Sequence, residues 1–202
     1  MSAPAPAARN VAAFDFDGTL AQRDTMGPFL ARVAGLGGLT RALALHSPRI
    51  AAVALGRADR DATKEAVVTS VLAGRTAGSI SGAGRAYADH LWERQKFRPK
   101  MLERLRWHRD AGHDIVIVSA SLDSYLVPLA PRLGVDHVIS SSLEVDGHGL
   151  VTGRLIGGNV RGPEKASRLR VWIGEGPVEL WAYGDSSGDD DLLAMADHPT
   201  RV

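Results

Sequence analysis

Cysteine is absent from this chain of 202 residues, and neither sign of charge dominates it. The absence of cysteine excludes disulfides, thiolate zinc sites and a cysteine nucleophile, and it favours a cytoplasmic location. The 24 basic and 23 acidic residues give a formal charge of +1. No global field therefore favours nucleic acid or an anionic membrane surface, and we expect no nucleic-acid partner. The length fits one domain, or one domain carrying an insertion.

Long apolar runs are also lacking. The most apolar region, residues 36–55, is interrupted by Arg41, Pro48 and Arg49, so it cannot cross a bilayer as one helix. Residues 1–10 are rich in Ala and Pro and resemble neither a signal peptide nor a membrane anchor. We expect them to form a mobile tail on a soluble, cytoplasmic protein with no stable membrane anchor.

Short apolar runs that end in turn residues are present instead, and they predict buried parallel strands. The helical stretch 99–110 and the break Ala111-Gly112 precede one of them, which gives a helix followed by a strand. Strands separated by helices predict an α/β fold with a doubly wound, Rossmann-like parallel sheet. The expected strands are residues 11–16, 114–119, 136–140 and 178–183.

The segment between the first two strands has apolar residues at helical spacing and no convincing strand. We expect residues 24–98 to form a helical cap inserted into an α/β core made of residues 1–23 and 99–202. Residues 143–155 alternate polar and apolar side chains around an Asp-Gly turn, which predicts a β-hairpin. The chain ends at Val202 inside an expected further strand, so we expect the natural protein to continue.

Two acids, Asp15 and Asp17, follow the first strand in the motif Asp-Phe-Asp-Gly-Thr. This places two carboxylates at the strand's carboxyl end, where open α/β sheets bind ligands. Two acids so close together repel each other unless a cation lies between them, and oxygen ligands favour Mg²⁺. An Asp-Gly turn with helix-capping acids is the structural alternative.

A second acidic motif, Gly-Asp-Ser-Ser-Gly-Asp, begins at Gly184, where another expected strand stops. Helix capping explains acids such as Asp190 and Asp191, which precede a short helical segment. It explains Asp185 poorly, because that residue lies at the strand end. Asp185 and Asp189 are therefore candidate partners of the first acidic pair.

Three further residues could hold a phosphate group. Ser119 ends a strand, the backbone N–H of Ala120 follows it, and Lys165 begins a helical stretch. A hydroxyl, an ammonium and a free N–H together suit the oxygens of a phosphate. Each alone is more often structural.

The order of these motifs resembles the haloacid dehalogenase superfamily, in particular subfamily IB with its C1-type helical cap, to which phosphoserine phosphatases belong. The resemblance implies that Asp15 attacks phosphorus and forms an aspartyl-phosphate, and that Asp17 acts as general acid and base. It also implies a Mg²⁺ cofactor, held by Asp15, the Asp17 carbonyl, Asp185 and Asp189. The implied phosphate ligands are Gly18, Thr19, Ser119, Ala120 and Lys165.

The expected substrate is a small phosphorylated metabolite, with phosphoserine as the first candidate. Asp24 matches the family's cap acid that contacts substrate, although it could equally cap a helix. Gly188 stands where phosphoserine phosphatases usually have Asn, which weakens the phosphoserine assignment.

Three alternatives stay open. The residues Asp24, Gly27, Phe29 and Leu30 also resemble a segment of phosphatidylglycerophosphatases, which would imply a lipid-phosphate substrate. A non-catalytic binding or regulatory protein with this fold would be favoured if Asp15 or Asp17 were replaced, and both are present. A phosphotransferase, which transfers the phosphoryl group to an acceptor other than water, would keep the same motifs.

Overall fold

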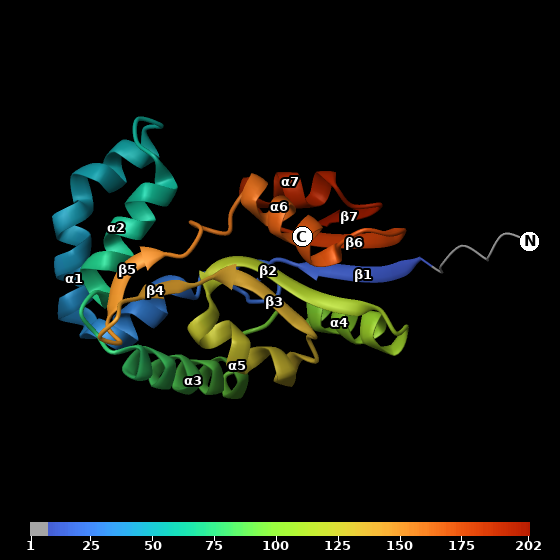
Figure 1. Ribbon diagram of the computed structural model, residues 1–202, viewed down its shortest axis with the longest axis horizontal. Coiled ribbons are helices and arrows are strands. Elements are labelled where there is room, and N and C mark those ends of the chain that lie inside the picture. Colours follow the sequence, from blue (N-terminus) through green and yellow to red (C-terminus); the bar gives the residue numbers. More distant parts are fainter. Residues whose placement is uncertain (1–7) are drawn as a thin grey trace, which may run out of the picture.

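The computed structural model describes residues 8–202 (Figure 1). The core is a sheet of five parallel strands in the order β3-β2-β1-β6-β7. Helices α4 and α5 cover one face of the sheet, and α6 and α7 cover the other (Figure 1). The predicted doubly wound α/β fold is confirmed. The strands are β1 (Arg9–Phe14), β2 (Asp114–Leu122), β3 (His137–Ser141), β6 (Val178–Gly184) and β7 (His198–Arg201).

The central strands form because their apolar side chains alternate between two cores. In β1, Ala12 and Phe14 join the core under α4 and α5, whereas Val11 and Ala13 join the core under α6 and α7. A strand buried on both faces reads as a continuous apolar run, which is why the sequence predicted it. The core helices are α4 (Pro99–Asp110), α5 (Asp123–Leu133), α6 (Pro163–Ile173) and α7 (Asp190–Ala194).

The start of β1 differs from the expectation for the N-terminal tail. Residues 1–7 of that tail lie outside the described residues, but Arg9 and Asn10 belong to the strand. The Arg9 guanidinium is paired with Asp114 and stacks on the Trp172 ring at 4.4 Å. These contacts hold the first residues of β1 in the sheet.

Three helices lie between β1 and α4: α1 (Met26–Ala54), α2 (Arg60–Leu72) and α3 (Ala77–Glu93). Helices α1 and α2 run side by side away from the sheet, whereas α3 lies along α5 (Figure 1). Helix α1 is kinked at Gly35, whose φ of 73° interrupts the helical backbone. None of the helices in residues 8–202 combines the length and apolar character that a membrane span needs.

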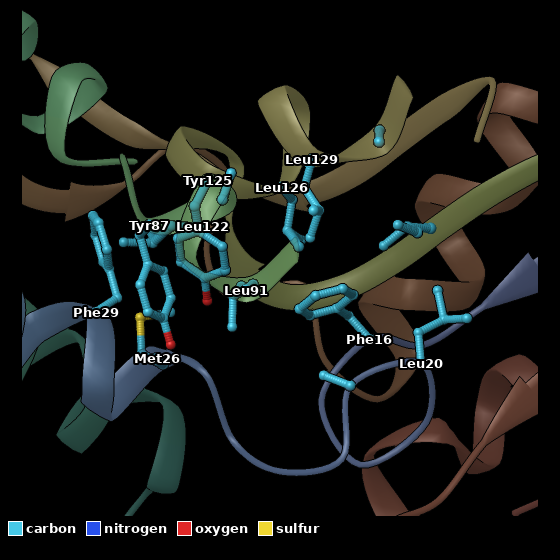
Figure 2. Close-up of a cluster of buried hydrophobic side chains, with 14 of the residues drawn as sticks. Phe16, Leu20, Met26, Phe29, Tyr87, Leu91, Leu122, Tyr125, Leu126 and Leu129 are labelled. Atoms are coloured by element: carbon cyan, nitrogen blue, oxygen red, sulfur yellow. The ribbon is translucent and has the colours of Figure 1, made fainter. Parts of the chain in front are cut away.

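An aromatic cluster joins α1 and α3 to the core helix α5. The rings of Phe29, Tyr87 and Tyr125, one from each helix, have centroids 5.0–5.6 Å apart. Figure 2 shows them together with Met26, from the first turn of α1. This packing fixes the beginning of α1 over the carboxyl end of the sheet.

The predicted β-hairpin is confirmed as the antiparallel pair β4 (Leu143–Val145) and β5 (Val151–Leu155). It packs against α2 through Gly153, which has a φ of +88°, and a Cβ there would lie 2.5 Å from the Thr69 Cα. The Thr69 hydroxyl donates a hydrogen bond to the Gly153 carbonyl at 3.0 Å. The hairpin thus supports α2 from the core side.

Candidate active site

Three predicted metal ligands meet at the carboxyl end of the sheet. Asp15 follows β1, Asp185 follows β6, and Asp189 ends a 3-10 turn just beyond it. Each offers one carboxylate oxygen, and these three atoms lie within 4.8 Å of one another. The backbone N–H of Asp15 donates to the Tyr183 carbonyl at 2.9 Å, which ties the first motif to β6.

Lys165 is the cation of this cluster. Its ammonium is buried and donates to Asp15 at 2.5 Å and to Asp189 at 2.6 Å. Among residues 8–202 it is the one cation that forms an ion pair with any of the three acids, and its two partners are Asp15 and Asp189. Three carboxylates with one ammonium retain an excess of negative charge, and hard oxygen donors suit Mg²⁺. The donor set therefore fits a divalent cation held by Asp15 and Asp185.

Gly18 allows the two acidic motifs to approach each other. Its φ is +79°, and a Cβ at this position would lie 2.1 Å from an Asp185 carboxylate oxygen. Only glycine combines this backbone conformation with so close a neighbour. Its sequence position in the first motif is thus explained by geometry as well as by resemblance.

Asp189 is positioned by its own turn. One carboxylate oxygen accepts hydrogen bonds from the Ser186 N–H and hydroxyl, each at 3.0 Å, and the other accepts from Lys165. Burial raises the pKa of Asp189, but the Lys165 charge and these hydrogen bonds together bring it below its usual value. Asp189 is therefore an ionised group that orients Lys165.

For Asp15, the effect of burial on the pKa outweighs the opposing effects. Burial raises its pKa to about 7, with Lys165 lowering it and Asp189 raising it further. A cation beside this carboxylate would favour the ionised form, which is the form that can act as a nucleophile. The geometry thus couples the protonation of Asp15 to the charge of its neighbours.

The Asp17 side chain is not part of the acidic cluster and is hydrogen-bonded to two hydroxyl groups instead. One of its carboxylate oxygens accepts from the Thr25 hydroxyl at 2.6 Å, and the other accepts from the Ser121 hydroxyl at 2.7 Å. Because the Thr25 proton is used on Asp17, the Tyr125 hydroxyl at 3.0 Å must donate to Thr25. Burial raises the pKa of Asp17 to about 6, against the lowering effect of these hydrogen bonds.

The predicted phosphate ligands lie around the same edge. Ser119 is buried, and its hydroxyl accepts from the Ser121 N–H at 3.2 Å. Thr19 is also buried, and its hydroxyl has no hydrogen-bond partner among residues 8–202. The Ala120 carbonyl accepts a hydrogen bond from Lys64 at 2.5 Å.

Asp24 caps the beginning of α1. Its carboxylate accepts a hydrogen bond from the Gly27 N–H at 3.0 Å. The side chain also lines the cavity above Asp15. Both of the expected roles for Asp24 are therefore compatible with its position.

Lys64, in α2, is a site residue that the sequence analysis missed. Besides Ala120, its ammonium contacts the Asn159 side-chain oxygen at 2.6 Å, and the Asn159 amide donates to Asp61 at 2.7 Å. Burial lowers the pKa of Lys64 to about 8. A lysine on a helix is usually a surface residue, so nothing local in the sequence distinguishes it.

Gly188, where Asn was expected from the resemblance, lies under a different side chain. A Cβ at Gly188 would be 3.0 Å from the Arg161 Nε. Arg161 lines the cavity and brings a second cation close to the acidic motif. The space beside Gly188 is therefore filled by a guanidinium from the segment before α6.

A cavity of about 820 Å³ covers these residues. Its floor contains Asp15, Asp17, Ser119, Lys165 and Asp185, and its roof is formed by α1 and α2. Such a volume lies within the range of roughly 300–1,000 Å³ typical of small-molecule sites.

Residues 12–194 match the family described as haloacid dehalogenase-like hydrolase, and the chain belongs to this family. Protein CicA of Caulobacter vibrioides is 38% identical over 185 residues, which cover 92% of this chain and 82% of that protein. Phosphoserine phosphatase SerB2 of Mycobacterium tuberculosis is 30% identical over 125 residues, covering 60% of this chain and 30% of SerB2. The resemblance to the phosphoserine phosphatase subgroup is thus confirmed.

The fold agrees with that of solved structures. A protein of unknown function from Bordetella pertussis superposes with a TM-score of 0.76 at 24% identity, covering 93% of this chain and 87% of that one. Phosphoserine phosphatases are among the other structures that share the fold. This chain is therefore a haloacid dehalogenase-like hydrolase with phosphatase relatives.

Proposed function

We propose that this chain is a Mg²⁺-dependent phosphatase that hydrolyses a phosphate monoester through an aspartyl-phosphate on Asp15. The observation that carries the proposal is the buried Asp15 carboxylate, held beside Lys165 and within 4.8 Å of two further acids. When bound, Mg²⁺ would offset the charge of these carboxylates and of the phosphoryl group. Asp15, Asp185 and the Asp17 carbonyl would hold it, and Asp189 would orient Lys165.

In the proposed reaction, an Asp15 oxygen attacks phosphorus and the ester P–O bond breaks. Asp17 donates its proton to the departing alkoxide, so the alcohol leaves neutral. The ionised Asp17 then takes a proton from water, which attacks phosphorus and releases inorganic phosphate from Asp15. Hydrogen bonds from Thr25 and Ser121 hold the Asp17 carboxylate in place for both transfers.

The phosphoryl oxygens would lie between Lys165, the Ser119 hydroxyl and the N–H of Ala120. The hydroxyl of Thr19 and the backbone at Gly18 would complete this cradle. These groups act by electrostatic stabilisation of charge on the transferring group. The finer choice of substrate would then depend on the cap helices that line the cavity.

The first experiment measures phosphate release from phosphoserine, p-nitrophenyl phosphate and a lysophosphatidate, with Mg²⁺ or with EDTA. We expect release that needs Mg²⁺ and is abolished in Asp15→Asn. The control is Asp190→Asn, an exposed acid of the same motif that pairs with Arg201. Release that survives in Asp15→Asn would overturn the proposal.

A second experiment detects the intermediate. With p-nitrophenyl phosphate the leaving group needs little protonation, so Asp17→Asn should slow mainly the hydrolysis step, by about 10²–10⁴-fold. Phosphorylated protein should then accumulate and be seen by mass spectrometry after an acid quench. No phosphate on the protein in this variant, with turnover intact, would contradict the aspartyl-phosphate route.

A further inference from the structure

The cap side of the cavity is apolar along the whole of α1. That helix contributes seven residues to the lining, and none carries a polar side chain. Before the kink at Gly35, Leu30 follows Met26 and Gly27 by one helical turn, and after the kink the lining residues continue along one side of the helix. They are Met26, Gly27, Leu30, Leu39, Leu43, Ile50 and Val53.

The opposite helix, α2, adds Val67 and Val68 to this wall. Of its four polar lining residues, Arg60 is exposed, and the other three are hydrogen-bonded within the protein itself. The Thr63 hydroxyl donates to the Asp59 carbonyl at 2.7 Å, and Asp61 and Lys64 are both bonded to Asn159. The space between α1 and α2 therefore offers apolar surface and few free polar groups to a ligand.

Two residues of the wall remain open to solvent. Leu43 and Ile50 line the cavity, and they keep 42% and 38% of their surface exposed to solvent. A ligand that covered them would remove apolar surface from water, which stabilises binding by about 0.8 kcal/mol for each buried methylene group. A small charged metabolite such as phosphoserine would leave this apolar surface exposed to water.

We infer that the cleft between α1 and α2 binds the hydrocarbon part of the substrate, so that the preferred ester is a phosphate monoester with an apolar chain. This inference rests on the proposed function for the position of the phosphate. The phosphate lies over Asp15 and Lys165, at the polar floor, and the chain extends along Leu43 and Ile50. One continuous cavity joins the two ends.

The test compares kcat/KM for ethyl, butyl, hexyl and octyl phosphate with that for phosphoserine. We expect kcat/KM to rise about two- to fourfold for each added methylene, because the chain is buried progressively. Equal values along the series, or a preference for phosphoserine over octyl phosphate, would overturn the inference.

Variants of the wall sharpen this test. Leu43→Asn should lower kcat/KM for octyl phosphate about tenfold and change that for ethyl phosphate less than about twofold. Leu45→Asn is the matched control, because Leu45 is 70% exposed on the same helix and does not line the cavity. Equal losses in both variants, or for both esters, would contradict a specific subsite.

A binding measurement tests this inference independently of the proposed reaction. Alkylphosphonates of the same lengths lack the scissile ester bond, and their Kd is measured by calorimetry with Mg²⁺ present. Affinity that rises with chain length, without hydrolysis of any ester, would support the subsite and overturn the phosphatase proposal. Affinity independent of chain length would overturn the subsite whatever the hydrolysis assay gives.

Discussion

The ammonium of Lys64 lies 2.5 Å from the carbonyl oxygen of Ala120 and links helix α2 to β2. The same peptide group carries the N–H of Ser121, which donates to the Ser119 hydroxyl at 3.2 Å. Lys64 therefore restrains one end of a peptide whose other end orients a proposed phosphate ligand. We therefore expect Lys64 to act through its neighbours, as a positioning residue.

Lys64→Met should lower kcat/KM about tenfold or more, because one charge-assisted hydrogen bond is worth about 1.5–3 kcal/mol. The measurement is steady-state phosphate release with p-nitrophenyl phosphate. Lys96→Met, a change of an exposed lysine, should leave kcat/KM unaffected. Equal activity of Lys64→Met and the unaltered protein would show that the contact does not matter for the reaction.

The pH dependence of kcat/KM should also depend on Lys64. Burial lowers the pKa of Lys64 to about 8, so the ammonium loses its charge as the pH rises through that value. We expect kcat/KM to fall on the alkaline side near pH 8, because the neutral amine no longer makes a charge-assisted hydrogen bond to the Ala120 carbonyl. Lys64→Gln should remove this break, and an unchanged break in that variant would assign it to another group.

Much of the core was predictable from the sequence because its signals are local. The runs that became β1 and β6 are apolar on both faces, and the acids after them lie where parallel strands end. Strand β2 extends to Leu122, beyond the expected end at Ser119, because its register with β3 shifts between these two residues. The division into a core and a cap at residues 24 and 98 stays a prediction.

The contacts that complete the site were not predictable. Thr25 and Ser121 are 96 residues apart, yet both hydroxyls bond to Asp17. Lys64 and Asn159 meet although they are 95 residues apart. Neither pair belongs to a sequence motif, because the contacts depend on how helices α1 and α2 lie over the sheet.

Gly18→Ala should weaken metal binding. The new Cβ would lie 2.1 Å from the Asp185 carboxylate and must displace it, and the φ of +79° adds a backbone cost of about 1–2 kcal/mol. We expect the Mg²⁺ concentration for half-maximal activity to rise at least about tenfold, which is a shift of about 1.4 kcal/mol.

Gly149→Ala separates these two effects. Gly149 has a φ of +77° and nothing within 4 Å of an added Cβ. It should therefore lose stability by a similar backbone cost and keep its Mg²⁺ dependence. A similar shift in Mg²⁺ requirement for both variants would show that Asp185 is not the cause.

His108 should make the fold sensitive to acid. Its ring is buried between His113 and the Tyr183 hydroxyl, and burial lowers its pKa from 6.5 to about 4. Between these values the unfolded chain binds more protons than the folded one, so stability is full above about pH 6.5 and falls as the pH drops towards 4. The loss is on the order of 2 kcal/mol.

The measurement is urea unfolding between pH 4 and 7.5 for the unaltered protein and for His108→Gln. Comparing the two isolates this histidine from the carboxyl groups that also titrate. The difference in unfolding free energy should shrink towards low pH. His148→Gln, at an exposed position in the hairpin turn, should keep the pH dependence of the unaltered protein. A constant difference for His108→Gln across this range would exclude the assignment.

Gly84→Ala should loosen the packing of α3 on α5. An added Cβ would lie 1.9 Å from the Ser124 carbonyl oxygen, and a backbone atom cannot move aside without shifting α5. Overpacking of this kind costs about 1–3 kcal/mol. For a chain of this size the Tm should fall by about 2–12 °C.

Gly78→Ala is the control, because Gly78 lies in the first turn of the same helix and a Cβ there would have nothing within 4 Å. This variant should instead raise stability by up to about 1 kcal/mol. Opposite signs for the two variants in thermal unfolding would confirm the close approach of α3 and α5, and equal stabilisation would contradict it.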